Sequence, residues 1–262
     1  MLRPRIIPCL LVKNKGLIKT VHFKGGKYLG DPINAVRIFN EKEVDELMVL
    51  DIDASAERAE PDFKMIENLA AECRMPFCYG GGVKTAGQVQ RIISLGVEKV
   101  AISSAAIETP ELISRVAGEM GSQSVVAVMD IRKKMLGGNY EVRTHNGKKS
   151  TGKCPIAFAR ELEERGAGEI VINSIDNDGM MNGYDLALVD EIRRTVTVPI
   201  TVLGGAGSLE DVGKLIRRYG IIGAAAGSLF VFKGSYRAVL INYPNHAEKD
   251  ALIEECYSMS QG

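Results

Sequence analysis

Short apolar runs alternate with segments of helical spacing along the whole chain. The apolar runs are continuous, as expected of parallel strands buried on both faces. We predict eight strands, over residues 5–12, 46–53, 76–80, 99–103, 124–131, 169–175, 199–203 and 222–227. Eight strand–helix units in about 250 residues indicate an α/β fold, the (β/α)8 TIM barrel. The alternative is a doubly wound open sheet, which usually has fewer strands and a single glycine-rich fingerprint.

An internal repeat favours the barrel. When the chain is shifted by 123 residues, Pro76 falls on Pro199 and Gly82 falls on Gly205. Two half-barrels of four strand–helix units each explain this register, which an open sheet would not produce. We therefore predict one barrel domain over residues 1–262.

The barrel pattern contains one sizeable insertion, at about residues 132–150 after the fifth strand. Gly137–Gly138 and Asn146–Gly147 are typical of tight turns, so the insertion is predicted to form a hairpin. It follows a strand directly, and loops in that position lie on the face of a barrel that carries the active site.

Composition narrows the classes of function. Lys plus Arg equals Asp plus Glu, 33 of each, which gives no reason to expect a nucleic-acid or membrane partner. No apolar run is long enough to span a membrane and the N-terminus does not resemble a secretory signal, so we expect a cytoplasmic protein. The five cysteines and three histidines show no metal-ligand spacing. We expect neither a metal nor a cofactor.

Glycine runs at 80–82 and 204–207 follow the third and seventh strands and lead into helices. Such runs let backbone N–H groups approach an anion, and a helix N-terminus adds partial positive charge. Residues 103–106 and 226–228 add hydroxyls after the fourth and eighth strands. Tight turns alone would also explain the glycines, but two copies in register favour two phosphate sites. The expected ligand is a small molecule with a phosphate at each end.

The stretches RIIPCL, DELMVLDIDAS, YGGG, SIDNDG, GYD and LGGAGS carry a resemblance over essentially the full chain. The sequence is similar to the cyclase subunit of imidazole glycerol phosphate synthase, the HisF family. The resemblance implies a lyase-type synthase subunit in a heterodimer with a HisH-like glutaminase. The glutaminase docks on the N-terminal face of the barrel and supplies ammonia. The family reaction yields an imidazole and an aminoimidazole carboxamide ribotide.

The resemblance also assigns residues to the site. The family uses two aspartates as acid and base, and Asp130 matches the second whereas Leu11 occupies the position of the first. Lys19 matches a lysine that contacts substrate. The other positions implied to bind substrate or phosphate are Asp51, Gly81, Gly82, Ser103, Ser104, Asn173, Ser174, Asp178, Gly179, Gly205, Ala206, Gly207, Gly227 and Ser228. Ser103, Ser104 and Asn173 differ from the usual asparagine, threonine and threonine.

The family closes its ammonia entrance with four charged residues, and the chain matches all of them with Arg5, Glu46, Lys99 and Glu169. Each begins a predicted strand. Charged residues at wet strand ends are common, but two cations and two anions together can neutralise one another.

Leucine can neither donate nor accept a proton, and loss of a general acid or base costs about 10²- to 10⁴-fold in rate. Asp51 or Asp53 from the adjacent strand are the alternative groups. The stretches 9–23, 30–47 and 227–234 resemble a side branch of the family. In that branch the barrel and a glutaminase supply ammonia to a third protein, which forms an acetamidino group on a sugar for surface glycans of the O-antigen type.

Three hypotheses therefore stay open. The chain acts in sugar amidation, or it is a true cyclase of histidine biosynthesis, or it is a non-catalytic scaffold that activates a glutaminase. An inward carboxylate at Asp130 speaks against the scaffold, because a scaffold does not need one.

Overall fold

The computed structural model describes residues 3–57, 59–134 and 137–258. Eight parallel strands form a closed barrel, because the last strand pairs with the first. In order around the barrel they are β1 (Arg5–Lys13), β4 (Leu47–Asp51), β5 (Phe77–Gly80), β6 (Lys99–Ile102), β7 (Val125–Lys133), β10 (Glu169–Ser174), β11 (Ile200–Leu203) and β12 (Gly223–Ala226). The predicted TIM barrel is confirmed, and each strand lies within two residues of its predicted bounds.

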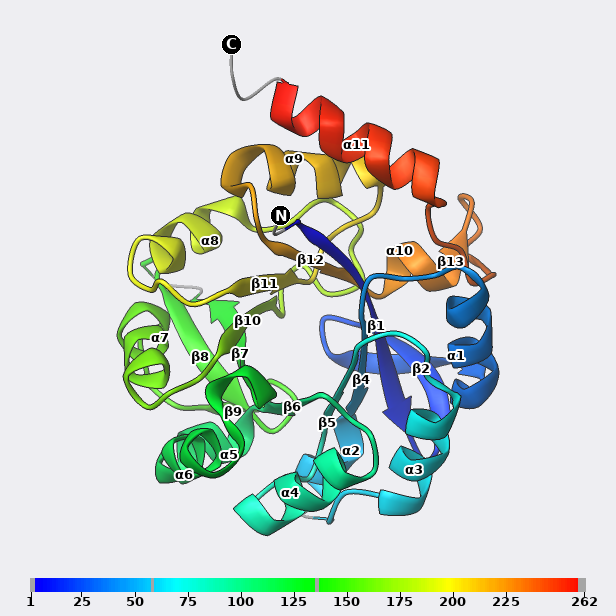
Figure 1. Ribbon diagram of the computed structural model, residues 1–262. Coiled ribbons are helices and arrows are strands. Elements are labelled where there is room, and N and C mark those ends of the chain that lie inside the picture. The colour runs from blue at the N-terminus through cyan, green and yellow to red at the C-terminus, as the bar shows by residue number, and fades with distance from the viewer. Residues whose placement is uncertain (1–2, 58, 135–136, 259–262) are drawn as a thin grey trace.

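Helices surround the strands (Figure 1). The longer ones are α1 (Pro32–Glu41), α3 (Phe63–Glu72), α4 (Ala86–Ser94), α6 (Glu111–Met120), α7 (Pro155–Glu164), α8 (Leu186–Arg193), α9 (Leu209–Tyr219) and α11 (His246–Ser258). Short helices are α2 (Ile52–Ala56), α5 (Ser104–Glu108), α10 (Ser228–Val231) and the 3-10 turn η1 (Ser122–Ser124). Reciprocal side-chain caps begin α4 at Thr85 and α9 at Ser208, directly after the two glycine runs.

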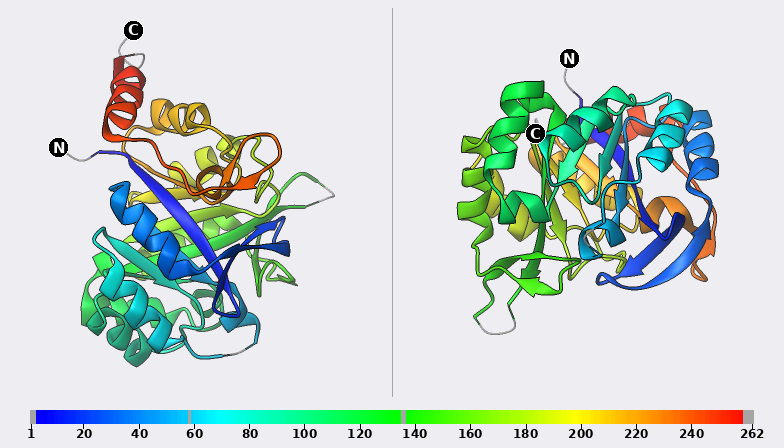
Figure 2. Two further views of the ribbon diagram at one scale, coloured as in Figure 1. Left: turned by 90° about the vertical axis from the view of Figure 1, so that its right-hand side faces the viewer. Right: turned by 90° about the horizontal axis from the view of Figure 1, so that it is seen from below.

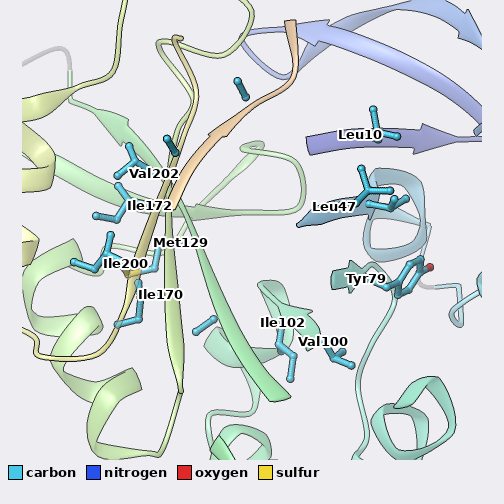
Figure 3. Packing of buried hydrophobic residues seen from close by; sticks show 14 of the residues in the cluster. Leu10, Leu47, Tyr79, Val100, Ile102, Met129, Ile170, Ile172, Ile200 and Val202 are labelled. Carbon is cyan, nitrogen blue, oxygen red and sulfur yellow. The ribbon is translucent and has the colours of Figure 1, made fainter. Parts of the chain in front are cut away.

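Buried apolar side chains form two clusters. The larger one fills the space between strands and helices, and Figure 3 shows part of it, with Leu10, Leu47 and Tyr79 on neighbouring strands. The smaller one fills the inside of the barrel, as in other TIM barrels. It consists of Ile7, Cys9, Met48, Cys78, Ala101, Val126, Val128, Val171, Leu203 and Ala225.

Two antiparallel additions stand at the barrel end away from the N-terminus (Figure 2). β2 (Gly16–Val21) and β3 (Lys24–Gly30) form a hairpin after β1. β8 (Tyr140–Thr144) and β9 (Lys149–Ser150) continue β7 within the predicted insertion, of which residues 135–136 lie outside the described part. The Gly- and Lys-rich sequence of β3 has no alternating buried face, so its pattern does not predict a strand there.

The C-terminal segment adds the small pair β13 (Phe232–Lys233) and β14 (Ala238–Val239), and α11 packs beside α9 (Figure 1). The buried Lys249 of α11 forms an ion pair with Asp45 at 2.8 Å, next to the start of β4. Across the described residues, we find no helix that is both long and apolar enough to cross a membrane.

Candidate functional site

The C-terminal ends of the strands surround one cleft with about 810 Å³ of open space. Strand ends that meet at this face bring residues distant in sequence together. Predicted site residues that line the cleft are Leu11, Asp51, Gly81, Gly82, Ser103, Ser104, Asp130 and Asn173.

Asp130 lines this cleft from β7. Its Oδ1 accepts a hydrogen bond from Asn173 Nδ2 at 2.8 Å, and its Oδ2 accepts one from Ser103 Oγ at 3.4 Å. Burial raises the pKa of Asp130 to about 6, although both hydrogen bonds favour the ionised form. A carboxyl with a pKa near neutral pH is suited to proton transfer.

Leu11 lines the same cleft from β1, the first strand of the other half-barrel. It lies beside Leu50 on β4 and opposite Ile18 on β2, and it packs on the apolar cluster inside the barrel. The cleft therefore has a polar side around Asp130 and an apolar side around Leu11.

The first predicted phosphate site lies at the edge of this cleft. Gly82 has a φ of +70°, and a Cβ there would lie 2.9 Å from Ala59 O, so only glycine fits without strain. Ser104 is held by the inserted hairpin, because Thr144 Oγ1 donates to Ser104 Oγ at 2.6 Å. Asp51 caps α2 by accepting from the amides of Asp53 and Ala54, while burial raises its pKa.

The second predicted phosphate site is a separate, smaller pocket at the ends of β11 and β12. Its lining includes Lys19, Gly179, Gly205, Ala206, Gly227 and Ser228. Gly205 has a φ of +115° and lies so close to Gly183 O that a Cβ is excluded. Ser228 Oγ is buried and has no hydrogen-bond partner among the described residues. A buried hydroxyl without a partner is costly, and a bound anion would satisfy it.

Lys19 is buried and bonded to Asp178. Its Nζ lies 2.5 Å from Asp178 Oδ1, and Asp178 Oδ2 accepts from Thr20 Oγ1 at 2.7 Å and from Phe23 N at 3.0 Å. This carboxylate therefore fastens the β2–β3 hairpin to the loop after β10. Asp178 thus makes three structural bonds, and its predicted contact with substrate stays a prediction.

Two further predicted residues stand slightly apart from the cavities. The amide of Gly207 donates to Asp211 Oδ2 at 3.0 Å, as part of the cap of α9. Ser174 is buried at the end of β10, and its carbonyl packs under Gly204. Neither residue lines the second pocket, but Ser174 packs against Gly204, which does.

The four charged residues at the opposite end form a closed ring. Arg5 bonds Glu46, and Arg5 Nη2 lies 2.8 Å from Glu169 Oε1. Lys99 Nζ lies 2.9 Å from carboxylate oxygens of both Glu46 and Glu169. Thr201 Oγ1 adds a hydrogen bond to Glu169 at 2.5 Å. Each charge thus touches two of opposite sign at the floor of the barrel.

The ring keeps its residues charged despite burial. Burial alone would raise the pKa of Glu169, but Arg5 and Lys99 more than offset this and the pKa lies below its usual value. Burial likewise opposes the charge on Lys99, and the two glutamates nevertheless raise its pKa. The ring is therefore electrically balanced without a ligand.

The tip of the inserted hairpin is a part of the site that sequence reading did not assign. Asn146 Nδ2 donates to Ile52 O at 2.6 Å, and the His145 amide approaches Ser104 Oγ at 3.5 Å. Thr144 and Asn146 thus join the loops after β4 and β6. The Asn146–Gly147 signal located the turn, but nothing in the sequence showed which loops it would contact.

Comparison with known proteins agrees with this arrangement. Residues 5–237 match the family described as histidine biosynthesis protein. A relative from Leptospira borgpetersenii, provisionally named imidazole glycerol phosphate synthase subunit HisF, is 58% identical over 97% of this chain and 100% of its own length. A Pseudomonas aeruginosa relative, provisionally named subunit hisF2, is 54% identical over 94% of this chain and 97% of its own. The subunit HisF of Hyphomonas neptunium is 40% identical over 88% of this chain and 91% of its own.

The fold and site thus define a barrel of the histidine-biosynthesis class. Within that class the chain belongs to the HisF family, the cyclase subunits of imidazole glycerol phosphate synthase.

Proposed function

We propose that this HisF-family barrel receives ammonia from a HisH-like glutaminase subunit and delivers it for acetamidino-sugar formation in surface-glycan synthesis. The observation that carries the proposal is Leu11, which faces the cleft of Asp130 in the place of the family's first catalytic aspartate. The cyclisation needs proton transfer on both sides of the reacting atoms, and an alkyl side chain supplies none.

Two further observations support a role in ammonia transfer. The charge ring stands at the N-terminal entrance, and both glycine-bordered pockets open at the mouth. Relatives numbered hisF2 and hisF3, at 54% and 55% identity, support a role beside that of a histidine cyclase. The ligand we propose carries phosphate groups that bind at Gly82 and Ser104 and at Gly205, Ala206 and Ser228.

A true cyclase of histidine biosynthesis is the second candidate. The family itself and the raised pKa of Asp130 favour it. A purely scaffolding role has less support, because Asp130 keeps two hydrogen-bond donors aimed at it inside the cleft.

The test is ammonia-dependent turnover of the bisphosphorylated histidine-pathway intermediate. We expect very weak turnover by the natural protein. Leu11→Asp should raise it by up to about 10²-fold, the lower end for a general acid or base.

Leu11→Asn is the matched control, because asparagine has the shape and polarity of aspartate but cannot transfer a proton at this position. A gain confined to aspartate supports the proposal. Family-typical turnover by the natural protein would return the chain to histidine biosynthesis.

The partner is tested separately, with any glutaminase that is encoded beside the gene of this chain. Lys99→Met opens the charge ring, so glutamine hydrolysis should continue while ammonia escapes to solvent instead of entering the barrel. The ratio of ammonia released to glutamine consumed measures this coupling. Failure of the natural barrel to bind that glutaminase would refute the conduit.

A further inference from the structure

A second cavity lies on the outer side of the first phosphate site. It has about 620 Å³ of open space and shares Val83, Ser104 and Ala105 with the central cleft. The two cavities therefore meet at the Ser104 hydroxyl. The outer cavity is otherwise lined by Lys84, Glu108, His145 and Lys149.

The Ser104 hydroxyl is oriented by the inserted hairpin. Thr144 Oγ1 donates to its oxygen at 2.6 Å, and the His145 amide approaches the same oxygen at 3.5 Å. Because a hydroxyl carries a single hydrogen, these contacts leave that hydrogen for an acceptor in one of the two cavities. Ser104 is thus prepared to donate to an anion at the boundary.

The outer cavity is mainly cationic. Lys84 precedes α4 and Lys149 begins β9, and both side chains are exposed at the cavity. Among the described lining residues the carboxylate is that of Glu108, which lies 3.7 Å from His145 Nε2. The two lysines contribute more positive charge than Glu108 removes, which favours an anion.

The second phosphate site gives an internal comparison, because the half-barrel repeat relates the two. The 123-residue shift places Gly207 where the first half has Lys84. Each site also has a hairpin beside it, β8–β9 at the first, which brings Lys149 to the outer cavity, and β2–β3 at the second, which brings Lys19 to the pocket. Among the described residues, the only cation in the lining of the second pocket is Lys19, and Asp178 neutralises it. The second pocket is also smaller, with about 230 Å³ of open space.

We propose that the first site accepts a diphosphate group, with one phosphate at Gly82 and Ser104 and the other between Lys84 and Lys149. The two phosphates of a diphosphate share one bridging oxygen, so they must occupy adjoining spaces, and the cavities on either side of Ser104 adjoin. The inference rests on the proposed phosphate sites and defines the ligand class more closely.

The test uses the full chain and two probes, inorganic phosphate and inorganic pyrophosphate. Backbone amide shifts of Gly82 and Ser104 report the first site, and those of Gly205 and Ser228 report the second. We expect pyrophosphate to bind the first site at least about tenfold more tightly than phosphate. The Lys84→Met/Lys149→Met variant should abolish this preference, with up to about fivefold weaker pyrophosphate binding for each exposed lysine.

Lys148→Met is the matched control, because it removes the same charge one residue away, where the side chain lines a different cavity. It should leave the preference for pyrophosphate unchanged, and the second-site shifts should persist in every folded variant. If the double variant weakens phosphate and pyrophosphate equally, or pyrophosphate has no advantage, the diphosphate inference is wrong while the phosphate sites stand. If neither anion shifts Gly82 and Ser104, both proposals fail.

Discussion

At the N-terminal end of the barrel four charged side chains bond one another, whereas at the mouth the carboxylate of Asp130 shares its cleft with Leu11. Glu169 in the ring has two cationic partners, whereas the partners of Asp130 in the described part of the chain are the neutral donors Asn173 and Ser103. The ring is complete without a ligand. At the mouth the charge of Asp130 is only partly compensated, so the energetic cost of that charge depends on what binds there.

The two ends consequently respond to pH in opposite directions. The pKa of Glu169 is lowered on folding, so its contribution to stability is present above its unfolded pKa and is lost as the pH falls. The pKa of Asp130 is raised to about 6, so the folded state binds the proton more tightly. Ionisation of Asp130 therefore destabilises the protein as the pH rises from about 4 to about 6.

The largest expected effect comes from breaking the ring. Glu169→Gln keeps the shape of the side chain but leaves Arg5 and Lys99 to share Glu46 alone. Removing one partner of a buried ion pair costs about 3–5 kcal/mol, and urea unfolding at neutral pH measures it.

Glu67→Gln is the matched control for this change, because Glu67 pairs with Lys64 at an exposed position. It should cost less than about 1 kcal/mol. Equal losses in the two variants would show that the ring charges do not depend on one another.

An intermediate effect is expected from Asp130→Asn. Asparagine can still accept from Asn173 but does not ionise. Above about pH 6 the variant should be more stable than the natural protein by about 1–2 kcal/mol, a value discounted because Asp130 partly faces the open cleft. Below about pH 4 the two should be nearly equal, and urea unfolding across this pH range gives the comparison.

Asp62→Asn is the control with the opposite expected change in stability with pH. The Met65 amide donates to Asp62 and lowers its pKa, so this variant should lose stability relative to the natural protein as the pH rises. If the Asp130→Asn difference did not change with pH, the carboxyl would not titrate as the structure implies.

The smallest expected effect is a change in the pKa of Asp130 when one of its hydrogen bonds is removed. Asn173→Ala removes the 2.8 Å hydrogen bond to Asp130, which favours the ionised form, so the pKa of Asp130 should rise above about 6. Ser103→Ala should raise it less, because that bond is 3.4 Å long. Carboxyl carbon shifts followed by NMR during a pH titration give both values, and the reverse order would contradict the structure.

The barrel was predictable because its signals are local and repeated. Continuous apolar runs marked the strands, and the 123-residue repeat fixed their number and register. The β2–β3 hairpin was missed because it is held by Asp178, which lies more than 150 residues away in sequence. No local pattern carries such a contact.

The site divides in the same way. Gly82 and Gly205 could be predicted from sequence as site residues, since their glycine runs lie just before helices. The contact of Thr144 with Ser104 could not, because it depends on how far the inserted hairpin reaches across the mouth. The bonds of Asp178 to Lys19 and Thr20 were equally unpredictable, since a motif gives a residue's position and not its partners.

The charge ring also bears on how such a barrel could arise from two copies of one ancestral half. Arg5, Glu46 and Lys99 belong to the first half, and Glu169 comes from the second. Two first halves joined together would bring four cations and two anions to the floor of the barrel, and two second halves would bring only glutamates. Only the combination of a first half with a second half gives a neutral ring. The ring therefore favours pairing of unlike halves over pairing of like halves. Duplicated halves that had diverged at this floor would therefore have depended on each other for a neutral ring.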